Sequence, residues 1–280
     1  MDILIVRDLI RSFLAEDIGA GDITSEAIFQ ADQNGMAEFV AREPFIAAGI
    51  ELIAAETFRL QNPEIHVAGI ADGTQVNEGD VILTASGPVL DLLKAERVAL
   101  NLAQRLCGIA TMTHQYVDKV RNFPVRIVDT RKTSPGLRVF EKYAVRVGGG
   151  YNHRYNLADG VLIKDNHIAA AGSVREAVER VRKQAPHTMR IEVEAESIDQ
   201  VEECLASGVD IIMLDNMDIE MMREAVKMID NGAIVEASGG ITLDNVKEVA
   251  GTGVDIISIG ALTHSVTACD IGMRIPLANL

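Results

Sequence analysis

One repeated pattern in the second half of the chain restricts the possible folds more than any other feature. After Pro124, short apolar runs of β character recur, and each of them ends in polar or charged residues. From the third run onward they are roughly twenty residues apart, with segments of helical periodicity between them. The runs are residues 125–128, 161–163, 191–193, 211–214, 233–235 and 256–259, and the helical segments are 197–207, 218–229 and 244–252. This alternation predicts a parallel sheet with helical connections.

Polar side chains at the carboxyl end of every predicted strand are typical of the active face of an α/β barrel. Six runs are visible where a complete barrel has eight strands, so we expect an irregular α/β barrel with fewer than eight strands. An open doubly wound sheet is the alternative. No G-x-G-x-x-G follows a first strand, so a dinucleotide site has little support.

The first half of the chain has a different pattern, in which helices and strands do not alternate regularly. Apolar spacing predicts helices over residues 3–16 and 50–61, and a strand over 35–42. Turn signals between short β-like runs predict hairpins of a small sheet within residues 65–86. Residues 90–121 have long helical periodicity, and Gly108 is a candidate break between two helices.

A basic segment, Arg131 to Lys164, stands out in an acidic chain of net charge −15. It holds seven Lys or Arg against Glu141 and Asp159, and a solvated basic face is the plainest explanation. Most of the cations are Arg, whose planar fork suits carboxylate and phosphate, and glycine-rich turns interrupt them. The segment therefore predicts an anion site for a small, multiply charged substrate. Its cations are Arg131, Lys132, Arg138, Lys142, Arg146, Arg154 and Lys164.

Composition excludes several classes of partner. A pI near 4.8, 4% aromatic residues and the absence of Trp disfavour nucleic-acid binding. No apolar run reaches the roughly 20 residues that cross a membrane, and the N-terminus does not resemble a signal peptide. Three widely spaced cysteines form no metal or redox motif, which predicts reduced thiols in a cytoplasmic protein.

Two carboxylates, Glu194 and Asp215, follow neighbouring predicted strands. Carboxylates side by side at a phosphate pocket suit Mg²⁺, bound directly or through water, and they suit the hydroxyls of a sugar equally well. The alternative is that each carboxylate only caps the helix that follows it.

Glycines follow the last two strands, in Ser238-Gly239-Gly240 and Ser258-Ile259-Gly260. Glycine-rich strand ends leave backbone N–H groups available to a phosphate, although glycine after a strand is also ordinary turn chemistry. As a consecutive pair late in a barrel, they predict the phosphate end of the site.

Lys164 ends an apolar run, where it can contact an anion or form a Schiff base if burial lowers its pKa. The neighbouring Asp165 favours the protonated, anion-binding form. The histidines lack metal-ligand spacing. We expect His153 to join the anion site and His264 to contact a phosphate, and we assign His167 a structural hydrogen bond.

Motifs along nearly the whole chain together resemble the quinolinate phosphoribosyltransferase family, also called nicotinate-nucleotide pyrophosphorylase (carboxylating). No position that carries the chemistry of the family departs from its pattern. The motifs are Ala41-Arg42-Glu43-Pro44, Glu96-Arg97 with Asn101, Gly108-Ile109-Ala110-Thr111, Asp129-Thr130-Arg131-Lys132-Thr133, Asn152-His153-Arg154, Leu162-Ile163-Lys164-Asp165-Asn166-His167, Glu192-Val193-Glu194, Leu214-Asp215-Asn216, Glu236-Ala237-Ser238-Gly239-Gly240 and Leu262-Thr263-His264-Ser265.

The resemblance implies an N-terminal α/β sandwich over residues 1–110, onto which the tail 270–280 packs, and a catalytic barrel over 111–280. It implies a homodimer in which Arg97 completes the partner's site, with a higher assembly of dimers as a further option. It also implies phosphoribosyl transfer from phosphoribosyl pyrophosphate to quinolinate, with loss of carbon dioxide, as a step of NAD biosynthesis. Mg²⁺ is required and no organic cofactor is.

By the same resemblance, each candidate residue has a role. Lys132, Glu194 and Asp215 are catalytic, and Glu194 and Asp215 serve Mg²⁺ and the ribose hydroxyls. The substrate-binding residues are Arg97, Thr130, Arg131, Lys132, His153, Arg154, Lys164, Glu194, Asp215, Ser238, Gly239, Gly240, Ser258, Gly260 and His264.

Three alternatives remain open. A paralogue on the same fold, such as the relative associated with molybdate transport, has a different acceptor. A barrel aldolase uses Lys164 as a Schiff-base amine. A non-catalytic phosphate-binding protein does not need the carboxylates of Glu194 and Asp215.

Overall fold

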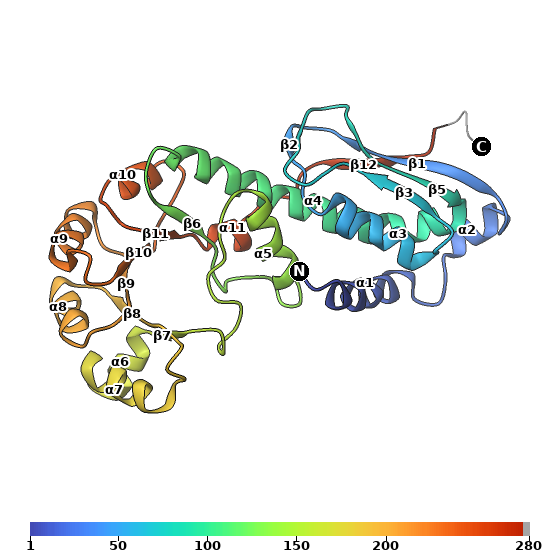
Figure 1. The fold of residues 1–280 in the computed structure, drawn as a ribbon. Helices are drawn as coiled ribbons and strands as arrows, with labels where there is room; N and C mark the ends of the chain where they lie inside the picture. The colour runs from blue at the N-terminus through green and yellow to red at the C-terminus, as the bar shows by residue number, and fades with distance from the viewer. Residues whose placement is uncertain (277–280) are drawn as a thin grey trace. The chain divides into compact units, whose positions relative to one another are not determined.

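The structure is a computed structural model that describes residues 1–276, and Figure 1 shows the chain. It forms two compact units. The first unit consists of Met1–His114, Ser134–Gly149 and the chain from Thr263, and the second of Gln115–Thr133 and Gly150–Leu262. The last four residues of the predicted tail, 277–280, lie outside the described residues.

An antiparallel sheet of four strands, in the order β12-β1-β5-β3, forms the centre of the first unit. Alternation of side chains in β1 places Ala37, Phe39 and Ala41 in the core. The strand near the end of the chain pairs with β1, with Phe39 opposite Met273. The strands are β1 (Asn34–Ala41), β3 (His66–Gly69), β5 (Val81–Pro88) and β12 (Ile271–Arg274), and a separate pair joins β2 (Phe45–Ile46) to β4 (Gln75–Val76).

Helices bury their apolar faces in this unit. Phe58 of α3 contacts Phe39 of β1 with ring centres 5.7 Å apart. The predicted helix 50–61 is divided into a π-helical turn and α3. The elements are α1 (Ile3–Ile18), α2 (Ile23–Ile28), η1 (Ile50–Ala54), α3 (Ala55–Gln61) and α5 (Arg138–Val147). Sheet and helices together form the expected α/β sandwich.

A single helix of 32 residues, α4 (Val89–Val120), occupies the segment in which we predicted a break. Gly108 does not break it, so that prediction was wrong. A Cβ atom on Gly108 would lie 2.2 Å from the carbonyl oxygen of Thr267. The glycine therefore allows another segment of the chain to approach the helix closely, and the helix continues through it.

The second unit contains the predicted parallel sheet. Its six strands have the order β6-β11-β10-β9-β8-β7, as expected for a barrel of fewer than eight strands. In Figure 1 the helices α8, α9 and α10 lie outside strands β8 to β10. The strands are β6 (Arg126–Val128), β7 (Val161–Ile163), β8 (Ile191–Ala195), β9 (Ile211–Asp215), β10 (Ile234–Ser238) and β11 (Ile256–Ser258).

Helices connect these strands as the alternation predicted. Ser197 and Asp218 cap α8 and α9 through their side chains, which explains where both helices begin. No helix in residues 1–276 is long and apolar enough to cross a membrane. The helices are α6 (Asp165–Ala171), α7 (Val174–Gln184), α8 (Ile198–Ala206), α9 (Ile219–Ile229), α10 (Val246–Ala250) and α11 (Ala261–His264).

Candidate active site

A cavity of about 450 Å³ lies at the carboxyl ends of the parallel strands in the second unit. Its wall carries both positive and negative side chains. Arg131 and Lys132 follow β6, Arg154 precedes β7 and Lys164 follows it, and carboxylates lie on β8, β9 and β10. The lining residues are Thr130, Arg131, Lys132, His153, Arg154, Leu162, Lys164, Asp165, Glu194, Glu196, Met213, Asp215, Glu236, Ser238 and Ser258.

Ten of the residues predicted from sequence line this cavity, and five do not. Gly239, Gly240 and Gly260 follow strand ends of the same unit but are not lining residues. Arg97 lies on α4, with its side chain 58% exposed and its Nη2 atom 3.8 Å from Glu96 Oε1. His264 ends α11, and its Nδ1 atom lies 2.6 Å from Ser265 Oγ. Both belong to the first unit.

The cations of the basic segment are divided between the two units. Arg131, Lys132, Arg154 and Lys164 line the cavity. Arg138, Lys142 and Arg146 lie instead on α5, which belongs to the first unit. Four of the seven cations from which we predicted an anion site therefore line this cavity.

Arg154 is held in place from one side. Its Nη1 atom donates a 2.7 Å hydrogen bond to the carbonyl oxygen of Gly160. Its Nε atom is buried and has no hydrogen-bond partner among residues 1–276. Burial and the nearby charge of Arg131 lower the pKa of Arg154 from its ordinary value. Two close guanidinium groups in a confined space favour an anion between them.

Lys164 is placed as an ion-pair partner. Its Nζ atom lies 2.7 Å from Glu194 Oε1, and its side chain is 45% exposed. This ion pair places Lys164 beside a carboxylate at the cavity wall, the arrangement of a charge-pairing residue. The Lys164 N–H donates to Nδ1 of His167 at 2.9 Å, so the structural role expected for His167 is confirmed.

Glu194 and Asp215 lie on the paired strands β8 and β9, as predicted. Neither caps a helix, because Ser197 and Asp218 do so. Asp215 Oδ2 accepts a 2.8 Å hydrogen bond from Nδ2 of Asn216, and the Asn216 N–H donates to the Ser238 carbonyl. Asn216 has a left-handed backbone with a φ of 55°. This residue therefore links the ends of β9 and β10 beside the cavity.

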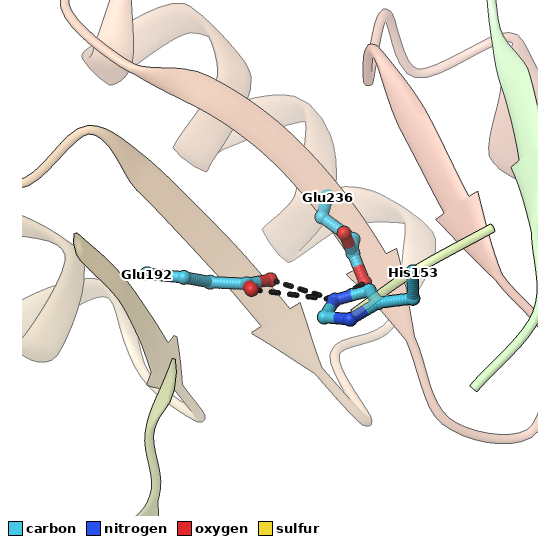
Figure 2. Close-up of side chains that lie close together, drawn as sticks. All are labelled: His153, Glu192 and Glu236. Atoms are coloured by element: carbon cyan, nitrogen blue, oxygen red, sulfur yellow. Dashed lines mark hydrogen bonds and ion pairs between the residues drawn. The ribbon is translucent and has the colours of Figure 1, made fainter. Parts of the chain in front are cut away.

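Two buried carboxylates of this site were not among the predicted residues. Figure 2 shows the side chains of Glu192 of β8 and Glu236 of β10 pointing toward the same nitrogen of the His153 ring. His153 Nε2 lies 3.3 Å from Glu192 Oε2 and 3.5 Å from Glu236 Oε1. Burial, and next the charge of Glu192, raise the pKa of Glu236 to about 8. Their sequence signal was a glutamate placed directly between two apolar residues of a strand, where charge is costly.

Asp129 is a further residue that sequence reasoning left out of the site. It is fully buried, and its two carboxylate oxygens accept hydrogen bonds from the His153 N–H at 2.9 Å and from Asn152 Nδ2 at 2.6 Å. Tyr151 forms a parallel bridge with Val128 of β6. Asp129 thereby fixes the segment that carries His153 and Arg154 to the end of β6.

A parallel α/β barrel whose strand ends combine four cations with paired carboxylates defines an enzyme for small polyanionic substrates. Residues 22–107 match the family described as quinolinate phosphoribosyl transferase, N-terminal domain. Residues 109–274 match its C-terminal domain. The chain belongs to the quinolinate phosphoribosyltransferase family.

Individual relatives cover the full chain. The chain is 48% identical over 280 residues to the probable nicotinate-nucleotide pyrophosphorylase [carboxylating] of Bacillus subtilis, covering 100% of this chain and 96% of the relative. Identity to the nicotinate-nucleotide pyrophosphorylase [carboxylating] of Mycobacterium leprae is 44%, covering 95% and 96%. The crystal structure of NadC from Streptococcus pyogenes has a TM-score of 0.93 and 40% identity, covering 99% of both chains.

Proposed function

We infer that this chain transfers the phosphoribosyl group of phosphoribosyl pyrophosphate to quinolinate in NAD biosynthesis. The products are nicotinate mononucleotide, pyrophosphate and carbon dioxide. The observation that carries this conclusion is the cavity itself, in which four cations face carboxylates at the strand ends. Both substrates are polyanions, and a protein of net charge −15 can bind them only where cations are concentrated.

The two carboxylates of quinolinate bind to the arginine side of the cavity. Arg131 and Arg154 offer planar forks that bind carboxylates through two parallel hydrogen bonds. The buried Nε of Arg154 is a donor still available to such a ligand. Lys132 lies on the same loop as Arg131 and neutralises the remaining charge.

The phosphoribosyl group binds at the ends of β8 to β11. Glu194 and Asp215 accept hydrogen bonds from the ribose hydroxyls, and Ser238 and Ser258 face the phosphate. We also assign backbone contacts with phosphate to Gly239, Gly240 and Gly260, and a contact to His264. The lining serines Ser238 and Ser258, at the last two strands, support this placement.

The donor set also fits Mg²⁺, because carboxylate oxygens are the protein ligands that this ion prefers. Asp215 is the better candidate, since Lys164 already occupies Glu194 Oε1. Mg²⁺, when bound with the substrate, neutralises the departing pyrophosphate.

The residues of the cavity then divide the chemistry between them. Positive charge develops on the ribose carbon as pyrophosphate leaves, and the nearby carboxylates stabilise it. The arginines hold the pyridine ring so that its nitrogen attacks that carbon. The carboxylate next to the nitrogen then leaves as carbon dioxide, because the positive nitrogen stabilises the electron pair left on carbon. The reaction needs no organic cofactor.

We propose that the active unit is a homodimer in which Arg97 reaches the partner's quinolinate. Two observations support this: Arg97 is exposed, and it does not line the cavity of its own chain. A cytoplasmic location is supported by three buried, free cysteines, since thiols remain reduced there.

A coupled assay tests the reaction. Purified protein is incubated with quinolinate, phosphoribosyl pyrophosphate and Mg²⁺, and both nicotinate mononucleotide and carbon dioxide are followed. Turnover should disappear with EDTA and with Lys132→Ala, whereas Lys183→Ala, a lysine on the exposed face of α7, should behave as wild type. Absence of product from folded wild-type protein would show that the acceptor is wrong, and other pyridine and pyrimidine carboxylates would then be screened.

A further inference from the structure

His153 lies at the floor of the cavity between two glutamates, and its protonation state decides what it contributes. We propose that Glu192 and Glu236 hold His153 as a neutral imidazole protonated on Nε2, and that His153 is a positioning residue for Arg154. It does not supply a positive charge to the anion site. The inference deepens the proposed function, because it rests on the role of Arg154 in binding quinolinate.

The backbone next to His153 determines which ring nitrogen carries the proton. The Arg154 N–H donates a 2.9 Å hydrogen bond to Nδ1 of His153. A nitrogen that accepts an N–H must present a lone pair, so the proton of the ring is on Nε2. An imidazolium would direct a second N–H against the Arg154 amide.

The opposite side of the ring agrees with this tautomer. Nε2 lies 3.4 Å from Glu192 Oε1, which can accept its proton, and Glu236 Oε1 lies 3.5 Å from the same nitrogen. The two glutamates are 5% and 2% exposed. The main-chain N–H of His153 donates to Asp129. The neighbours of this residue on β6, β8 and β10 therefore hold one orientation of the ring, as Figure 2 shows for the two glutamates.

A metal ion is the competing explanation for this cluster. Ligand atoms of His153, Glu192 and Glu236 all lie within 4.8 Å of one another, and the Oε1 atom of Glu236 is buried without a hydrogen-bond partner. A metal on Nε2 requires the ring proton on Nδ1. The Arg154 amide N–H already donates to Nδ1, so Nδ1 cannot carry the ring proton. The geometry therefore favours a proton on Nε2 over a metal ion.

The consequence concerns Arg154. Its main-chain N–H is held by the His153 ring and its Nη1 atom by Gly160, so backbone and side chain are both fixed. The negative charge of Glu192 also favours the charged form of Arg154. Glu192 therefore acts on the substrate through His153 and Arg154, without touching it.

Ring-nitrogen NMR of the wild-type enzyme tests the tautomer without reference to activity. In histidine-¹⁵N-labelled protein at pH 7, long-range ¹H–¹⁵N spectra should show an unprotonated Nδ1 and a protonated Nε2 for His153. The signals of His153 are identified by their loss in His153→Gln. If His153→Gln does not fold, they are identified by their shift in Glu192→Gln. Two protonated nitrogens, or a proton on Nδ1, would overturn the inference.

Substitutions of Glu192 test the positioning role by titration of quinolinate and of phosphoribosyl pyrophosphate. The side-chain amide in Glu192→Gln still accepts the Nε2 proton, so this variant should bind quinolinate within about threefold of wild type, whereas Glu192→Ala should lose about tenfold or more. The affinity for phosphoribosyl pyrophosphate should be unchanged in both Glu192→Gln and Glu192→Ala. Equal losses in both variants would mean that Glu192 balances an imidazolium, and the inference would be wrong. A failure of wild type to bind quinolinate would count against the proposed function alone, since the NMR result does not depend on it.

Discussion

Two guanidinium groups share a narrow cavity, and the approach of Arg131 to Arg154 raises the free energy of the empty site. Burial and the Arg131 charge lower the pKa of Arg154, which shows that the cations disfavour each other. We expect a bound dicarboxylate to remove this repulsion, so that its affinity depends on both arginines.

Replacement of Arg131 by alanine should therefore weaken quinolinate far more than phosphoribosyl pyrophosphate. Loss of one charge-assisted, partly buried pair corresponds to about 2–5 kcal/mol, or roughly 30-fold to several thousand-fold in Kd. Titration calorimetry of each substrate measures the difference. Arg180→Ala on α7 removes an exposed pair with Glu176 and a hydrogen bond to the Ala171 carbonyl, away from the cavity, and serves as the control. Equal losses of both substrates would contradict the assigned role.

Glu236 gives the molecule a pH-dependent stability. Its pKa is raised from 4.5 to about 8 in the folded protein, so the folded state holds this proton more strongly than the unfolded state does. Its contribution is complete below about pH 4.5 and is lost as the pH rises through about 8. Between these values the slope is about 1.4 kcal/mol per pH unit.

Glu236→Gln has no such proton, so its free energy of unfolding should fall less steeply between pH 5 and 8 than that of wild type. Urea unfolding at several pH values measures both slopes. Asp199→Asn, a carboxylate at the beginning of α8 and away from the cavity, is the control. Parallel slopes for Glu236→Gln and wild type would show that Glu236 ionises normally.

At the scale of elements, α4 depends on a glycine that helix propensity disfavours. Gly→Ala in a helix interior is normally stabilising by about 1 kcal/mol. At position 108 the added methyl would lie 2.2 Å from the Thr267 carbonyl oxygen, so Gly108→Ala should instead destabilise by about 1–3 kcal/mol. Thermal unfolding tests this sign, with Ser12→Ala on the exposed face of α1 as the comparison. A stabilised Gly108→Ala would exclude the close approach.

The residues that follow β9 and β10, Asn216 and Gly239, lie in close contact. Gly239 has a φ of +88°, and a Cβ there would lie 2.2 Å from Asn216 Oδ1. Gly239→Ala should displace Asn216, and through it the Asp215 carboxylate, with a fall in kcat of about tenfold or more. Asn216→Gly keeps the left-handed backbone and removes the two side-chain atoms nearest the added Cβ, leaving only the backbone nitrogen at 2.9 Å, so it should partly restore Gly239→Ala. A double-mutant cycle of kcat measures this coupling, and strict additivity would refute it.

Sequence periodicity predicted most elements because apolar spacing and capping residues are local signals. Ser197 and Asp218, for instance, mark the beginnings of α8 and α9. It failed at Gly108, whose reason is a contact with Thr267, more than 150 residues away. The residues of the candidate site also differ in how far a local signal identifies them. Arg131 and Asp215 follow strands and were found, whereas Glu192 and Glu236 lie inside strands, and only the pairing of β8, β9 and β10 brings them to His153.

At the scale of the whole molecule, the proposed homodimer makes each site a joint product of two chains. Arg97→Ala and Lys132→Ala would each inactivate every site of their own homodimer. In a mixed dimer, both defects fall in one site and leave the other intact. Mixing equal amounts under conditions of subunit exchange should restore about a quarter of wild-type activity.

This complementation is measured with the coupled assay, beside light scattering to confirm the dimer. Arg97→Ala mixed with an equal amount of Lys183→Ala controls for dilution and exchange. Activity that stays at the level of the separate variants, despite demonstrated exchange, would place Arg97 outside the partner's site.

The strand β12 also sets an order of events during synthesis. It pairs with β1 in the antiparallel sheet, yet Ala41 and its partner Ile271 are separated by the whole second unit of the chain. While the ribosome produces those intervening residues, β1 presents an unpaired edge, which is the kind of surface on which other strands assemble. The parallel sheet of the second unit can be completed first, because all of its strands precede residue 271. A chain truncated just before β12 and released from the ribosome should therefore contain a finished barrel sheet and an unfinished first unit, with the edge of β1 left unpaired.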